Sequence, residues 1–170
     1  MPDQHPTVEA WLLQYQDRVL RLAYTLLGNR EAAEDAAQDS LFHIARWCLA
    51  HADFVPTDAW VWQVTRNAVR DAVRRHPPYA VPLDDGVLVD DTVEDLPVER
   101  MDVARALAAL SVPDREILVF YYFLDLTSRE VARVLGISAT AARIRLSRAR
   151  KRFAAVYGRA GKEGPSHEAR

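Results

Sequence analysis

The sequence predicts an all-α protein of two small helical domains joined by an extended acidic linker, the second domain being a helix-turn-helix. Apolar residues recur every three or four positions along most of the chain, as in helices, and no segment has the alternation of a strand. A proline-rich, acidic stretch interrupts this pattern near the middle. We expect a first domain at residues 8–76, a linker at 77–97, a second domain at 98–157 and a disordered tail at 158–170.

The first domain is predicted to contain three helices. The first, residues 8–27, ends at Gly28, and Asn29 can cap the second, which runs to about residue 50. A break at Pro56 precedes the third helix, residues 59–75. The positions expected to face the core are Leu12, Tyr15, Val19, Leu22, Ala23 and Leu26 in the first helix, Ala33, Ala37, Leu41, Ile44 and Cys48 in the second, and Val61, Val64, Ala68 and Ala72 in the third.

The predicted linker, residues 77–97, combines prolines with acidic side chains and contains no lysine or arginine. Repulsion between its like charges favours an extended chain. Beyond it, the pattern indicates a helix at residues 99–110 and another that opens at Ser111.

The strongest local pattern lies at residues 127–152. Thr127 and Glu130 have the spacing of a capping box, in which each side chain accepts a hydrogen bond from the other residue's backbone N–H. Gly136 can take the left-handed conformation of a turn, and Ser138 can cap the next helix. A short helix, a glycine turn and a second helix form a helix-turn-helix, whose second helix fits the major groove of DNA.

The second helix of this motif is basic, and residues 138–152 contain no acidic side chain. Arg143 is the expected base reader, because arginine can bind guanine through two parallel hydrogen bonds. The residues nearest the base edges are Thr140, Ala141, Arg143 and Arg145, and the expected phosphate contacts are Arg148, Lys151 and Arg152. The alternative is a solvated basic helix end, which the helix dipole also favours.

The third predicted helix carries tryptophans beside arginines. Trp60 is expected in the core, whereas Trp62 lies off the expected apolar stripe, near Arg66 and Arg70. An exposed aromatic ring beside cations suits single-stranded DNA, which stacks on the ring and pairs with the charges. Packing in the core is the alternative for Trp62.

The second predicted helix has an acidic face, formed by Glu31, Glu34, Asp35, Gln38 and Asp39. Most faces of this kind are only solvated. The histidines are scattered and Cys48 is the single cysteine. The sequence therefore predicts no catalytic residues, no metal site and no cofactor, and we do not expect the protein to be an enzyme. The absence of a signal sequence and of an apolar run of ~20 residues suggests a cytoplasmic protein without membrane insertion.

With these motifs placed, the sequence resembles the extracytoplasmic-function group of bacterial sigma factors. The resemblance lies in Tyr15–Tyr24, in the segment beginning Gly28-Asn-Arg-Glu, in Ala59-Trp-Val-Trp-Gln-Val-Thr-Arg-Asn-Ala, and in the helix-turn-helix that ends Arg145-Leu-Ser-Arg-Ala-Arg150. It covers residues 8–157.

The resemblance implies two partners, core RNA polymerase and promoter DNA. The clamp helices of the polymerase β′ subunit would bind Asp35, Gln38 and Asp39, and the β flap would bind the second domain. The minus-ten element would be held by Trp62, Arg66, Asn67, Arg70 and Arg74, with the loop at residues 51–58 receiving a flipped base. The minus-thirty-five element would be read by the basic helix. An anti-sigma factor is also implied as a partner.

Two other classes of protein remain open at this point. A stand-alone helix-turn-helix regulator that binds an operator as a dimer would explain the second domain, but would leave Trp62 and the acidic face without a role. An interaction protein, such as an anti-sigma antagonist or adaptor, would use the helical faces without touching DNA. Co-purification with core polymerase and run-off transcription separate these classes.

Overall fold

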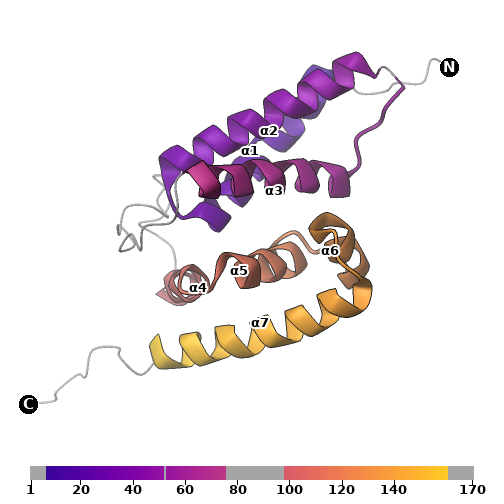
Figure 1. Cartoon of the computed structure of the whole chain (residues 1–170). Coiled ribbons are helices and arrows are strands. Elements are labelled where there is room, and N and C mark those ends of the chain that lie inside the picture. Colours follow the sequence, from indigo (N-terminus) through magenta and orange to yellow (C-terminus); the bar gives the residue numbers. More distant parts are fainter. Residues whose placement is uncertain (1–6, 52, 76–97, 161–170) are drawn as a thin grey trace, which may run out of the picture. The chain divides into compact units, whose positions relative to one another are not determined.

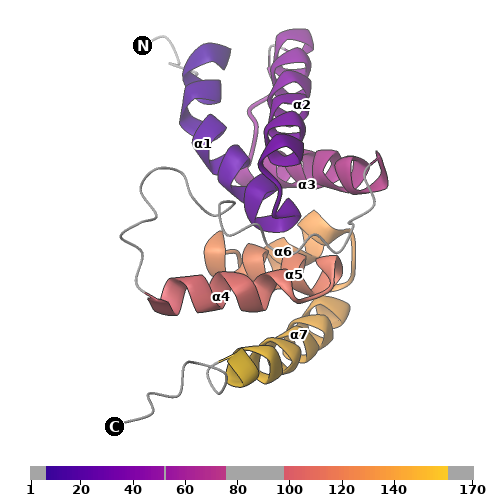
Figure 2. The same cartoon turned by 90° about the vertical axis from the view of Figure 1, so that its left-hand side faces the viewer.

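The computed structural model describes residues 7–51, 53–75 and 98–160, and within these residues it contains helices and turns but no strand. The chain divides into two compact units (Figures 1 and 2). The first unit holds α1 (Val8–Leu27), α2 (Arg30–Ala50) and α3 (Asp58–Arg75). The second holds α4 (Val98–Ala108), α5 (Val112–Leu118), a π-helical turn η2 (Val119–Phe123), most of α6 (Ser128–Leu135) and α7 (Ala139–Ala160).

The first unit is a three-helix bundle in which α1 packs along α2 and α3 contacts both. Its helix ends follow the predicted capping residues. Gly28 ends α1 with a φ of +66°, and the Ala32 N–H donates to the Asn29 side chain at 2.9 Å. The core is formed by side chains with no exposed surface, including Val19, Leu22, Leu26, Ala33, Ile44, Val61, Trp62 and Val69.

The second unit is built around α7, which packs against α4 and α5. Ser111 caps α5, accepting from the Asp114 N–H at 3.4 Å. The buried residues of this unit include Ala106, Ile117, Phe120, Val131, Ala142, Leu146 and Ala149.

The predicted all-α fold with two helical units is confirmed, and each helix begins and ends close to its expected position. The main difference in length is at α7, which continues to Ala160, past the predicted end of the second domain at 157. The predicted linker at 77–97 and the part of the predicted tail from 161 to 170 lie outside the described residues.

Candidate nucleic-acid interface

The turn between α6 and α7 has the geometry that the sequence predicts. The Thr127 N–H donates to Glu130 Oε2 at 2.8 Å, and the Glu130 N–H donates to Thr127 Oγ1 at 3.3 Å. Gly136 has a φ of +66°, and the Ala141 N–H donates to Ser138 Oγ at 3.1 Å. The capping box, the glycine turn and the N-cap of α7 therefore form a complete helix-turn-helix.

The two faces of α7 differ sharply in burial. Ala142, Leu146 and Ala149 are at most 5% exposed and pack on the rest of the unit. Because side chains three or four positions apart share a face, the opposite, exposed face of α7 carries Thr140, Ile144, Ser147 and Lys151, flanked by Arg143 and Arg148. This exposed face holds most of the residues predicted to contact DNA.

Two of the predicted DNA contacts, Arg145 and Arg152, also have partners inside the protein. Arg145 Nη2 donates to the Pro113 carbonyl oxygen at 2.6 Å and lies 3.8 Å from Glu116 Oε2. Arg152 Nη1 lies 2.6 Å from Asp114 Oδ2. The Asp114 and Glu116 side chains are only 7% and 3% exposed, so these arginines neutralise carboxylates that are withdrawn from water. Neither carboxylate was indicated by the sequence.

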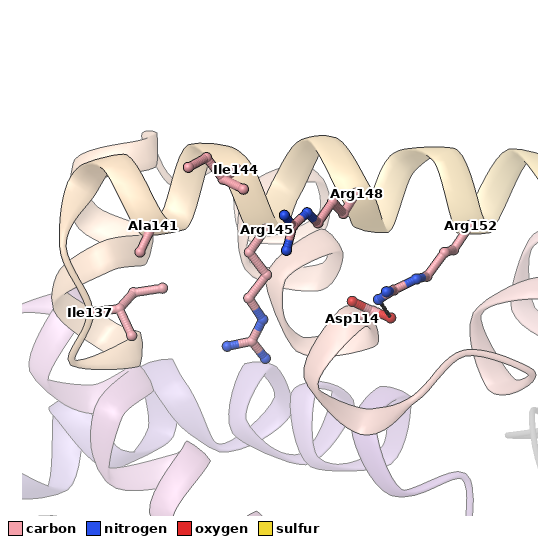
Figure 3. Close-up of a pocket in the computed structure, with 7 residues that line it drawn as sticks. All are labelled: Asp114, Ile137, Ala141, Ile144, Arg145, Arg148 and Arg152. Carbon is pink, nitrogen blue, oxygen red and sulfur yellow. Dashed lines mark hydrogen bonds and ion pairs between the residues drawn. The ribbon is translucent and has the colours of Figure 1, made fainter.

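A groove of about 540 Å³ runs between the start of α5 and α7 (Figure 3). It is lined by Asp114, Ile137, Ala141, Ile144, Arg145, Arg148 and Arg152. On the α5 side of the groove, Asp114 also accepts a hydrogen bond from the Ser111 hydroxyl at 2.9 Å, which helps to hold the carboxylate beside Arg152. The groove therefore combines an apolar strip with cations held in defined positions.

A buried arginine fixes α5 relative to α4. Arg115 Nε donates to the Leu107 carbonyl at 2.9 Å, and its Nη2 donates to the carbonyls of Ala108 and Leu110 at 2.7 and 3.3 Å. Burial lowers the pKa of the Arg115 guanidinium. The side chain satisfies the carbonyls at the end of α4, where a helix leaves its last acceptors without partners.

The structure corrects the predicted exposure of Trp62. Its side chain has no exposed surface and lies in the core, with its ring 5.8 Å from that of Tyr15 and 4.8 Å from the Arg18 guanidinium. The buried face of α3 is formed by Val61, Trp62, Thr65, Arg66, Val69 and Ala72, about one residue round from the predicted stripe. Stacking of a base on Trp62 would require this core to open, and Arg66 is only 8% exposed.

Other predicted residues of α3 do lie on its surface. Asn67, Arg70 and Arg74 are exposed, and Trp60, expected in the core, is only half-buried. The aromatic residues near the surface lie instead around the loop before α3. Trp47 stacks on His51 at 4.1 Å, and Phe54 meets Trp60 edge-on at 4.9 Å. Sequence reasoning missed this aromatic cluster, although the presence of Trp47 before Pro56 and Trp60 after it was a signal for it.

The start of α3 is tied to α1 by a polar network. The Tyr15 hydroxyl donates to Asp58 Oδ1, and Arg18 Nη2 lies 3.7 Å from Asp58 Oδ2. Burial, followed by the adjacent Asp58 carboxylate, raises the pKa of Tyr15 to about 12. This network holds the first turn of α3 and the end of the loop that precedes it.

The acidic face of α2 is exposed, as predicted for Glu31, Glu34, Asp35, Gln38 and Asp39. Asp39 pairs with Arg75 at 3.0 Å, and Glu34 pairs with Arg30 at 2.8 Å. Within the described ranges, no three His, Cys, Asp or Glu side chains are grouped so that they could hold a metal ion. Among the helices described, none is long and apolar enough to span a membrane.

Comparison with known proteins assigns families to both halves of the chain. Residues 11–77 match sigma-70 region 2, and residues 100–153 match sigma-70, region 4. The chain is 30% identical over 159 residues to the ECF RNA polymerase sigma factor SigM of Bacillus subtilis (strain 168), covering 90% of this chain and 96% of that protein. It is 25% identical over 161 residues to the ECF RNA polymerase sigma factor SigW of the same organism, covering 81% of each.

A solved structure shares the fold. The sigma factor RpoE, in a co-crystal with the anti-sigma factor NepR from Bartonella quintana, matches with a TM-score of 0.70. Its sequence identity is 22%, and the match covers 88% of this chain and 96% of that one.

Proposed function

Because the chain belongs to the ECF sigma factors, which bind core RNA polymerase and direct promoter recognition and transcription initiation, we propose that its two helical units divide promoter recognition between them. The second unit would bind the minus-thirty-five element through α7. The first unit would bind core polymerase through α2 and the minus-ten element through α3. On this assignment the domains are residues 8–76 and 98–157, joined by the acidic segment 77–97.

The exposed face of α7 is the main support for assigning the minus-thirty-five element to the second unit. It follows a complete helix-turn-helix turn and presents Thr140, Arg143, Arg148 and Lys151 to solvent. The second helix of a helix-turn-helix enters the major groove with its N-terminal residues near base edges and its later cations near phosphates. We assign base contact to Thr140, Ala141 and Arg143, and phosphate contact to Arg148 and Lys151. Arg145 and Arg152 are assigned mainly to holding α7 on α5.

The minus-ten assignment rests on the exposed residues of α3 and on the aromatic cluster before it. Asn67, Arg70 and Arg74 would follow the backbone of the melted strand. The cluster of Trp47, His51, Phe54 and Trp60, around the loop that precedes α3, would offer aromatic rings on which an unstacked base can stack. Trp62 and Arg66 are left out of the direct contacts because they are buried.

The polymerase contacts are assigned by charge and exposure. The exposed carboxylates and amide of Asp35, Gln38 and Asp39 would meet the clamp helices of the β′ subunit, and the second unit would meet the β flap. Sigma factors are regulators without enzymatic activity, so the chemistry of transcription would belong to the polymerase, in the cytoplasm. An anti-sigma factor is a further proposed partner, because the structural relative was crystallised with one.

Transcription with purified components tests the proposal. Core RNA polymerase is incubated with the full chain and a genomic fragment library, and the start sites of the transcripts are mapped. We expect a small set of starts that share two elements at a fixed separation and that disappear without the protein. Failure of the chain to bind core polymerase, or transcripts identical with and without it, would contradict the proposal and would favour an operator-binding regulator.

The assignment of α2 to polymerase binding has its own test. Asp35→Ala should weaken binding to core polymerase, whereas Glu9→Ala, an exposed carboxylate in the first turn of α1, should not. Equal binding of the two variants would show that this part of α2 does not contact polymerase.

A further inference from the structure

We propose that Ile144 reads a thymine in the upstream promoter element, through contact with the 5-methyl group of that base. The inference rests on the proposed function, because it assigns a base to the helix that the function places in the major groove. It concerns a residue that sequence reasoning passed over in favour of the neighbouring arginines.

Ile144 occupies the centre of the exposed face of α7. It lies four residues after Thr140 and seven before Lys151, and its neighbours on the opposite side of the helix, Ala142 and Leu146, are buried. Its side chain is 49% exposed, although this face is otherwise polar or cationic. Arginine or lysine has a higher helix propensity than isoleucine, so helix stability does not explain why an isoleucine occupies this exposed position.

A single exposed apolar residue needs no explanation on its own, but Ile144 is not isolated. Ile137 and Ala141 line the same groove, and together these three side chains form an apolar strip (Figure 3). Arg145, Arg148 and Arg152 border the strip. Two of these arginines are fixed by carbonyl and carboxylate oxygens of α5, so the strip is held between cations rather than covered by them.

This combination selects its ligand by chemistry. Arg148 and Lys151 suit the phosphates of a duplex, and the apolar strip then faces the floor of the major groove. The thymine 5-methyl is the one hydrocarbon group that the four bases present there, and it is contacted by apolar side chains in protein–DNA complexes. A cytosine at the same place would present an amino group to the isoleucine, and that group would lose its hydrogen bond to water.

The test removes the methyl group from the DNA and the side chain from the protein. The probe is a promoter fragment transcribed by core polymerase with the full chain, and each thymine of its upstream element is replaced in turn by deoxyuridine, which lacks only the methyl group. Binding of the holoenzyme is measured with the unaltered chain, with Ile144→Ala, and with Val103→Ala. Val103 is a matched control, because it is an exposed β-branched residue of α4 in the same unit, 40% exposed.

We expect one thymine at which deoxyuridine weakens binding by about fourfold, the effect of losing one buried methyl group. Ile144→Ala should weaken binding to the thymine-containing fragment at least as much and should no longer distinguish thymine from deoxyuridine at that position. Val103→Ala should behave like the unaltered chain. Circular dichroism checks that each variant is folded.

The possible failures are distinct. If deoxyuridine has the same effect on the unaltered chain and on Ile144→Ala at every position, the inference is wrong while the proposed function stands. The inference is also wrong, and the proposed function still stands, if holoenzyme with Ile144→Ala binds the thymine and deoxyuridine fragments as the unaltered chain does but binds a protein partner more weakly. If no fragment is transcribed at all, the proposed function fails and the inference fails with it.

Discussion

Asp114 and Glu116 are buried at the start of α5, and each holds one arginine of α7. From the sequence, the basic residues of α7 that were expected to contact DNA were ranked only by their distance from the start of the helix. In the structure, Arg145 and Arg152 neutralise buried carboxylates, whereas Arg143, Arg148 and Lys151 extend from the exposed side of the helix. The division matters because a side chain committed to a protein partner must break that contact before it can bind DNA.

Arg143→Ala and Arg145→Ala should therefore differ in kind. Arg143→Ala should reduce discrimination at one base pair of the upstream element by ~1–3 kcal/mol while leaving the free energy of unfolding nearly unchanged. Arg145→Ala should lower the free energy of unfolding by about 1–3 kcal/mol, because it removes the hydrogen bond to the Pro113 carbonyl and the charge beside Glu116. Denaturant unfolding and holoenzyme binding to single-base variants measure the two effects. Equal losses on every sequence for Arg143→Ala would reassign that residue to phosphate contact.

Asp114→Asn tests the carboxylate side of the same contact. The amide keeps an acceptor for the Ser111 hydroxyl but loses the charge that holds Arg152, so the free energy of unfolding should fall by about 1–3 kcal/mol. Asp102→Asn is the control, because the Asp102 side chain is 31% exposed, against 7% for Asp114, and lies 4.0 Å from Arg105 on the same helix. Such pairs contribute about 0.5 kcal/mol or less. Similar unfolding curves for the two variants would show that burial of Asp114 adds nothing.

Tyr15 gives the first unit a dependence on alkaline pH. Its pKa is raised to about 12 in the folded chain, from 10.0, so the neutral phenol is favoured by folding. This contribution is fully present below pH 10 and is lost as the pH rises towards 12, because the unfolded chain ionises first. Tyr15→Phe should reduce the fall in the free energy of unfolding across this range, measured by denaturation at a series of pH values. An unchanged fall would mean that Tyr15 is not held buried beside Asp58 in solution.

At the scale of single elements, the turn before α7 depends on the φ of Gly136, which is +66° with no atom near the position of an added Cβ. Gly136→Ala should therefore cost only backbone strain, about 1–2 kcal/mol. Gly158, which also has open space around it, lies within α7 at an ordinary helical φ. Gly158→Ala should stabilise the chain by about 0.5–1 kcal/mol. Thermal unfolding of both variants should show shifts of opposite sign, and shifts of the same sign would contradict the turn geometry.

The helices and their caps were predictable because they depend on residues close together in sequence. Gly28, Asn29, Ser138 and the Thr127–Glu130 pair each occupy the expected capping position. The face that α3 buries was predicted only in part: Val61 and Ala72 are buried as expected, whereas Val64 and Ala68 are half-buried. The buried face depends on what α1 presents to α3. Trp62 lies against Tyr15 and Arg18, which are far from α3 in the sequence, so a pattern within α3 could not reveal this contact.

The candidate interface divides in the same way. The exposed face of α7 was indicated by its charge, since every residue that defines it lies within one helix. The pairing of Asp114 with Arg152 spans 38 positions, and that of Pro113 with Arg145 spans 32. Only the packing of α5 on α7 brings these groups together, so a linear pattern could not separate structural arginines from those at the surface.

At the scale of the whole molecule, charge is distributed unevenly. The formal net charge is −2, yet α7 is basic and residues 77–97 are acidic. Binding to duplex DNA grows with the number of phosphates that cations neutralise, and a chain without a basic excess gains little from this term alone. We therefore expect the chain to depend on polymerase to bring it to the duplex, with α7 then adding discrimination between sequences.

This distribution predicts a contrast between the isolated chain and the holoenzyme. The isolated chain should bind promoter and scrambled duplexes with similar, weak affinity, in the range of roughly 10⁻⁴–10⁻⁶ M that is typical of non-specific contacts at physiological salt. The holoenzyme should prefer the promoter, and Lys151→Ala in the holoenzyme should reduce the slope of log K against log salt concentration by about one. Fluorescence anisotropy over a salt series measures both. Nanomolar, salt-resistant binding of the isolated chain to one duplex would show instead that it recognises its site without polymerase.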